Sequence, residues 1–141
     1  GYVVGGNGSA ANIVGVLNGI FFNAADTLKP TFSNFYKATI TPANSEDTTA
    51  FVIDDPFQQY VVAADAATGV TTFLETYDMN TSAGSDTTGK SSSTLDIATT
   101  SADGKQFRLL RSAEDPENED ATAVRHSVVV VSNLNSFNGH N

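Results

Sequence analysis

The sequence contains no cysteine, no tryptophan and only seven lysine and arginine residues among 141. The lack of cysteine excludes disulfide bonds, thiolate metal sites and a cysteine nucleophile. The few cations stand against sixteen acidic residues, and the resulting net charge of −9 repels phosphate backbones. No apolar run approaches the roughly 20 residues that a membrane-spanning helix requires. We therefore expect neither nucleic acid nor a membrane as a direct partner, and no cofactor.

Helix-forming patterns are also scarce, because no long window keeps apolar residues at helical spacing and Thr, Val, Ser and Gly are abundant. Short β-branched and aromatic runs instead alternate with turn-forming residues, which is typical of β-sandwiches and β-barrels. The sequence predicts an all-β fold for residues 1–141, a single-domain antiparallel β-sandwich or β-barrel with long polar loops. Strands are expected at Tyr2–Val4, Asn12–Phe22, Phe35–Ile40, Thr49–Ile53, Gln58–Ala63, Val70–Tyr77, Ser93–Ala98, Gln106–Ser112 and Val124–Asn133.

The last of these expected strands is the clearest. Side chains alternate between the two faces of a strand, so His126, Val128 and Val130 share one face while Val129 and Val131 share the other. Both faces become apolar from Val128 onward, which predicts a central position in its sheet. A histidine in such a strand is expected to be packed and hydrogen-bonded.

Two polar segments are expected to lie outside the sheets. Residues 79–94 contain almost no apolar side chains, and we expect a mobile, exposed loop there. Residues 134–141 read as a polar tail that one large apolar residue, Phe137, interrupts. Tails of this composition are disordered unless a partner binds them.

A glycine motif near the start, Gly6-x-Gly8-x-x-Ala11, matches part of a dinucleotide-binding fingerprint. That fingerprint requires a helix directly after the glycines, so that the helix N-terminus faces the pyrophosphate. The following residues, Asn12–Gly19, are β-branched and contain two further glycines, which disfavours a helix. We interpret the motif as a glycine-bent corner of a β protein.

Acidic residues gather in two turn-like segments. Asp54-Asp55-Pro56 follows an apolar run, where paired carboxylates can act in acid–base chemistry or hold a cation, and where Asp can also cap a turn. The segment Glu114–Asp120 spaces its oxygen ligands like a calcium loop, but Asp120 stands where the turn glycine belongs. We expect ordinary turns at both places, and no catalytic or metal site.

Several ordered segments together resemble small structural proteins of tailed-bacteriophage heads, some of which are decoration or cement proteins. The resemblance runs from about Gly5 to Asn135. It is carried by IVGVLNGIFF, a stretch ending in TPAN, AFVIDDPFQQYVVAAD, a serine- and threonine-rich loop leading to STLDIAT, and QFRLLRSAEDPENE before a valine strand. The resemblance implies a non-enzymatic β-rich protein on the capsid exterior of a virion, bound to the major capsid protein as a homo-dimer or homo-trimer.

Contacts of this kind depend on a few aromatic anchors inside a polar rim. The candidates for such an interface are Tyr2, Phe21, Phe22, Phe32, Phe35, Tyr36 and Phe137. Two other classes remain open. One is a carbohydrate-binding or receptor-binding β-sandwich, which the absence of tryptophan disfavours. The other is a small hydrolase that pairs Asp54 or Asp55 with Glu114 or Asp115, for which no motif orients the carboxylates.

Overall fold

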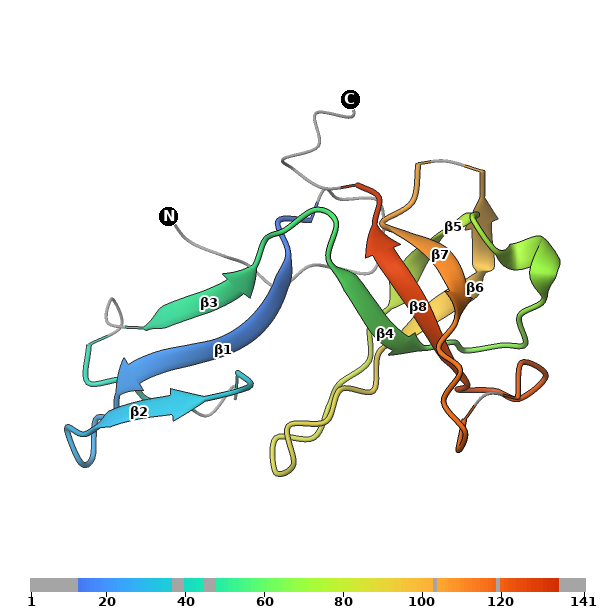
Figure 1. The fold of residues 1–141 in the computed structure, drawn as a ribbon. Coiled ribbons are helices and arrows are strands. Elements are labelled where there is room, and N and C mark those ends of the chain that lie inside the picture. Colours follow the sequence, from blue (N-terminus) through green and yellow to red (C-terminus); the bar gives the residue numbers. More distant parts are fainter. Residues whose placement is uncertain (1–12, 37–39, 45–47, 103, 119, 135–141) are drawn as a thin grey trace.

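Two antiparallel sheets make up the described part of the chain (Figure 1), which confirms the predicted all-β fold. The computed structural model describes residues 13–36, 40–44, 48–102, 104–118 and 120–134. Three strands form a sheet in the order β2-β1-β3, and five form a sheet in the order β4-β8-β7-β5-β6. The elements are β1 (Val16–Asn23), β2 (Pro30–Ser33), β3 (Thr49–Ile53), β4 (Gln59–Ala63), the 3-10 helix η2 (Val70–Thr72), β5 (Thr76–Asn80), β6 (Thr94–Ser101), β7 (Phe107–Ser112) and β8 (Ser127–Ser132).

The five-stranded sheet curls until its two edge strands meet. Ala64, which follows β4, forms a parallel bridge with Leu95 of β6, and the Asp65 N–H donates to the Leu95 carbonyl at 3.0 Å. The Asp65 carboxylate accepts the Ile97 N–H at 3.0 Å, so a side chain extends this closure. The curled sheet encloses the main hydrophobic core, which consists of Ala64, Tyr77, Leu95, Phe107, Leu109, Val128 and Val130.

Strand β8 lies between β4 and β7, which confirms the central position expected from its valines. Val128 and Val130 are fully buried inside the curl, and Val129 on the opposite face retains only 4% exposure. Neighbouring strands satisfy the backbone on both sides of β8, so its apolar faces can be buried without loss of hydrogen bonds.

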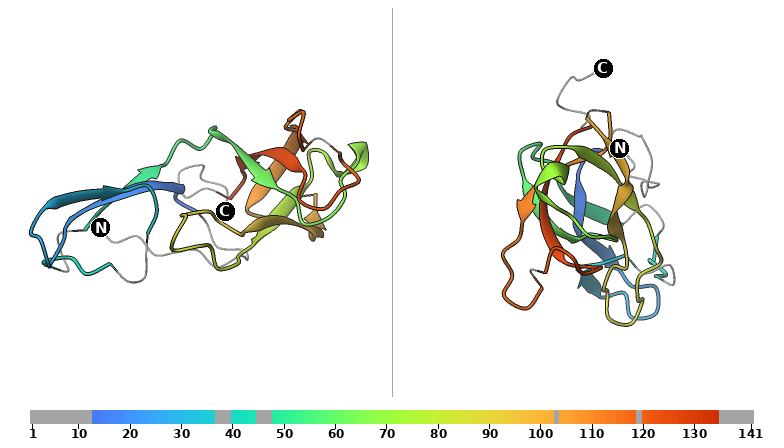
Figure 2. Two further views of the ribbon diagram at one scale, coloured as in Figure 1. Left: turned by 90° about the horizontal axis from the view of Figure 1, so that it is seen from below. Right: turned by 90° about the vertical axis from the view of Figure 1, so that its right-hand side faces the viewer.

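The three-stranded sheet projects to one side of the curled sheet, and the molecule is elongated as a result (Figure 2). Two segments connect the sheets. The chain before β1 is fastened by the Ile13 N–H, which donates to the Leu134 carbonyl at 2.9 Å. The chain after β3 turns at Asp55, whose carboxylate accepts the Phe57 N–H at 2.9 Å. The Asp-Pro segment is thus a capped turn between the two sheets, one of the two interpretations that the sequence allowed.

Two of the expected strands are wrong. The Phe35–Ile40 strand is not formed at the described positions, and the chain pairs earlier, in β2. The Val70–Tyr77 strand is replaced at its start by η2, because the Thr72 hydroxyl and N–H both donate to the Gly69 carbonyl. Leu74 then has a φ of 68°, which no strand accommodates, so β5 begins only at Thr76.

The polar loop expected near residues 79–94 occupies residues 81–93, since β5 extends to Asn80 and β6 begins at Thr94. It turns back on itself, with the Ser85 N–H donating to the Lys90 carbonyl and the Gly89 N–H donating to the Ser85 carbonyl. The expected first strand, the Gly6-x-Gly8 motif and the tail from residue 135 lie outside the described residues. The chain that follows the motif enters β1 and not the helix that a dinucleotide site requires.

Candidate interaction surface

The three-stranded sheet has one buried and one exposed face. On the buried face, Ile20 and Phe22 of β1 retain only 2% and 7% exposure. Residues paired across antiparallel strands point to the same side, so Phe21, Phe32 and Thr49 share the other face. Gly19 pairs with Phe51, which places Phe51 on that face as well. The sheet therefore gathers aromatic side chains from all three strands on its exposed side.

Three phenylalanines on this side, Phe21, Phe32 and Phe51, are called the aromatic face below. They are 38%, 60% and 47% exposed. The rings of Phe32 and Phe51 lie with their centroids 6.1 Å apart and their planes inclined by 49°. Gly19 lies against the Phe32 ring, since a Cβ added there would be 2.6 Å from that ring. The absence of a side chain at Gly19 thus lets the two edge strands bring their rings together.

A bulge in β1 sets which residues reach this face. Leu17 pairs with Val52 and Gly19 pairs with Phe51, so Asn18 is an extra residue without a partner in β3. An extra residue reverses the in–out alternation that follows it. The bulge is the reason that Phe21 points outward while Leu17, on the far side of it, points to the opposite face.

The structure separates the aromatic residues that the sequence proposed as anchors. Phe21 lies on the aromatic face, as does Phe32, whereas Phe22 is buried on the opposite face and cannot serve as an exposed anchor. Phe35 is half-buried, and its ring lies against Gly89 of the polar loop. Tyr36 is 59% exposed. Tyr2 and Phe137 lie outside the described residues.

Sequence reasoning missed Phe51 as an anchor, although it predicted the bounds of its strand correctly. The alternation in Thr49–Ile53 was the available signal, since Phe51 must point opposite to Ala50 and Val52. Which of the two sides is exposed depends on the partner strand, and so on the bulge in β1.

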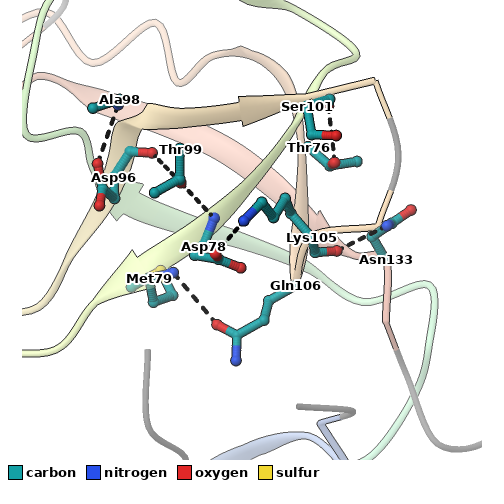
Figure 3. Close-up of polar contacts among 10 residues, drawn as sticks. All are labelled: Thr76, Asp78, Met79, Asp96, Ala98, Thr99, Ser101, Lys105, Gln106 and Asn133. Atoms are coloured by element: carbon teal, nitrogen blue, oxygen red, sulfur yellow. Dashed lines mark hydrogen bonds and ion pairs between the residues drawn. The ribbon is translucent and has the colours of Figure 1, made fainter. Parts of the chain in front are cut away.

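A polar cluster lies in the curled sheet, between β5, β6 and β7 (Figure 3). Lys105 forms an ion pair of 2.8 Å with Asp78, whose side chain is only 6% exposed. The Asp78 N–H donates to the Thr99 hydroxyl, which itself donates to the Asp96 carbonyl, where β6 bulges away from β5. The Thr99 hydroxyl therefore takes the place of a backbone acceptor that the irregular β5–β6 pairing leaves out. The cluster thus links the neighbouring strands of the curled sheet.

The acidic turns use their carboxylates locally. Asp115 accepts the Glu117 N–H at 3.1 Å in the same way that Asp55 caps its own turn. Within the described ranges, no group of three or more His, Asp or Glu residues is placed to hold a metal ion. Burial, followed by the negative charges of Asp55 and Asp54, raises the pKa of the Tyr60 phenol. The turn between the sheets is thus an acidic region.

His126 is fully buried and hydrogen-bonded through both ring nitrogens, which confirms the predicted packing, although it lies just before β8 and not within the strand. Its Nδ1 lies 2.9 Å from the Ala123 carbonyl and its Nε2 lies 2.7 Å from the Thr68 hydroxyl. Since a carbonyl only accepts, Nδ1 carries a proton, and in the neutral ring Nε2 accepts from Thr68. The histidine fastens the acidic loop to the segment after β4.

Hydrogen bonds in the same loop lower the pKa of Asp120. The Thr122 hydroxyl donates to the Asp120 carboxylate at 2.6 Å and the Thr122 N–H donates at 3.0 Å, and these two bonds lower the pKa of Asp120. A lowered pKa in the folded state contributes stability above the ordinary pKa that is lost as the pH falls through the lowered value. We predict that Thr122→Val moves the pKa of Asp120 upward, as measured by NMR titration of the carboxyl carbon. Thr122→Ser keeps the hydroxyl and should keep the low pKa. An equal pKa in both variants would contradict this assignment.

Comparison of the chain with protein-family models, with curated proteins and with solved structures found no match. Among the residues that the structure describes, no helix has the length and apolar character needed to cross a membrane.

Proposed function

We propose that this protein is a non-enzymatic structural component of a tailed-phage head, which attaches to the capsid exterior by protein–protein contact through its aromatic face. The observation that carries the proposal is the exposure of Phe21, Phe32 and Phe51 together on one face of a projecting sheet. Contiguous exposed apolar groups on a small protein mark an interaction surface. The sequence resemblance supplies the class of partner, the major capsid protein.

The physical requirements of capsid decoration agree with this surface. A copy needs only a modest patch, because the symmetry of the shell repeats the contact and linked copies gain avidity. Aromatic anchors give large contact area at low cost in side-chain entropy. Copies assembled as a dimer or trimer around a symmetry axis would engage several capsid subunits at once.

The test is cosedimentation of the purified protein with empty, expanded heads assembled from the major capsid protein of the same phage. We predict that Phe32→Thr combined with Phe51→Thr weakens binding by about 30-fold or more, because both anchors are lost while the strands keep β-forming residues. Urea unfolding of the variant would show that the fold is retained.

Phe57→Thr is the matched control, since Phe57 is 80% exposed but lies in the turn after β3 and not on the aromatic face. It should bind heads like the unmodified protein. Equal binding by the double variant, or an equal loss in the control, would contradict the assigned surface. Failure of the unmodified protein to bind heads, together with binding to a glycan array, would favour the carbohydrate-binding alternative.

A further inference from the structure

Among the described strands, β3 lies at the edge of the three-stranded sheet and has β1 as its only strand neighbour. The direction of its backbone groups follows from the β1–β2 pairing. The Ala24 N–H donates to the Lys29 carbonyl, so the even-numbered residues of this part of β1 face β2. Phe21 therefore faces β3, where it pairs with Thr49.

Alternation along β3 then fixes its outer edge. Thr49 and Phe51 direct their N–H and C=O groups toward β1, and Ala50 and Val52 direct theirs outward. Among the described residues, none forms a hydrogen bond with these outward groups. An edge with free backbone groups is a template for an added strand.

The sequence of β3 lacks the residues that usually prevent a further strand from pairing with an edge. The five residues Thr49–Ile53 contain no proline, no glycine and no charged side chain, which are the usual means of blocking strand addition. The opposite edge strand, β2, begins with Pro30 and is blocked in that way. An added strand would also extend the sheet beside Phe51, so its side chains would lie next to the aromatic face.

The acidic residues next to β3 indicate which charge an incoming strand would carry. Exposed Asp54 and Asp55 directly follow β3, so acidic residues lie beside one end of an uncharged strand. A cation at that end of an incoming strand would therefore be favoured. A second copy of β3 would bring the same acidic residues and no cation, which disfavours self-pairing.

We propose that the outer edge of β3 is a strand-addition site for an extended segment of the capsid protein that has an apolar centre and a Lys or Arg at the end that lies beside Asp54 and Asp55. This inference rests on the proposed function, because the capsid presents the segment. It adds a backbone-mediated contact to the side-chain contacts of the aromatic face.

Val52→Pro is the decisive variant. It removes an outward N–H, and the β1–β3 pairing does not use that N–H, so the edge tolerates proline there. Val52→Thr is the matched control, since it keeps the N–H. We expect Val52→Pro to bind heads about 10-fold more weakly than Val52→Thr, because one backbone hydrogen bond and the close approach of the partner strand are lost. Equal head binding by the two variants would overturn the edge site and leave the proposed function intact.

A peptide measurement tests the edge independently of the capsid. The probe is the peptide Lys-Val-Thr-Phe-Thr-Val-Lys, compared with the same peptide carrying Glu at both ends. We expect only the Lys-flanked peptide to bind, with slower amide exchange at Ala50 and Val52 and with weaker binding at higher salt. Asp54→Asn, a change at an exposed position that leaves β3 unaltered, should weaken this binding.

The two measurements separate the two proposals. If the unmodified protein does not bind heads, the proposed function fails and the peptide alone decides the edge. Lys-peptide binding that is lost in Val52→Pro and retained in Val52→Thr would support the edge site. Binding that ignores Val52→Pro, or that favours the Glu-flanked peptide, would overturn it.

Discussion

Replacing Leu109 by alanine is expected to lower the free energy of unfolding by about 4 kcal/mol. Leu109 of β7 is fully buried at the centre of the curled sheet, where it packs in the main core. The truncation removes buried methyl groups and leaves a cavity that the surrounding strands fill only in part. Urea unfolding followed by circular dichroism measures the change as a shift of the midpoint at constant slope.

Val61→Ala is the control for this prediction, because Val61 lies on β4 of the same sheet and is 66% exposed. Its effect should stay within about 0.5 kcal/mol. A loss below about 1 kcal/mol in Leu109→Ala would show that the curled sheet is not the main source of stability.

Replacing Lys105 by methionine is expected to cost about 3 kcal/mol of stability, since it leaves the buried Asp78 carboxylate without its cation. The other carboxylate oxygen of Asp78 has no partner among the described residues, so no second donor compensates for the loss. Denaturant unfolding at neutral pH measures the effect. Combining Lys105→Met with Asp78→Leu should recover most of the stability, because an apolar pair then replaces a broken ion pair.

Lys90→Met removes the same charge from an exposed position of the polar loop and should change stability by less than about 0.5 kcal/mol. A similar loss in Lys90→Met and Lys105→Met would mean that net charge matters and the ion pair does not. A double variant as unstable as Lys105→Met alone would show that the unpaired Asp78 carboxylate is not the source of the loss.

The strands that pack the core could be predicted from the sequence, because their burial leaves a regular pattern. The valines of β8 reflect burial on both faces, the alternation of β4 reflects one exposed and one more buried face, and both strands were predicted within a few residues. Strand β2 was missed because its four residues include Pro30 and carry no clear alternation. The β-branched run after Gly69 favoured a strand, but hydrogen bonds from Thr72 to the Gly69 carbonyl hold it in a 3-10 turn.

The candidate surface could be predicted only in part. Abundant phenylalanine indicated anchors, and Phe21, Phe32 and Tyr36 are exposed as an interface requires. The face on which each ring lies depends on strand pairing and on the extra residue Asn18, and a single sequence reveals neither. Because the face of each ring depends on this pairing, the sequence favoured Phe22 as an anchor and did not indicate Phe51.

The placement of the core within one sheet has an evolutionary consequence. The main core cluster draws all of its fully buried members from the curled sheet and its flanks, and the aromatic face lies on the other sheet. Substitutions at Phe21, Phe32 or Phe51 would therefore alter the aromatic face and leave the main core unchanged. Under the proposed function, such a division would let the binding specificity change through intermediate sequences that keep most of their stability.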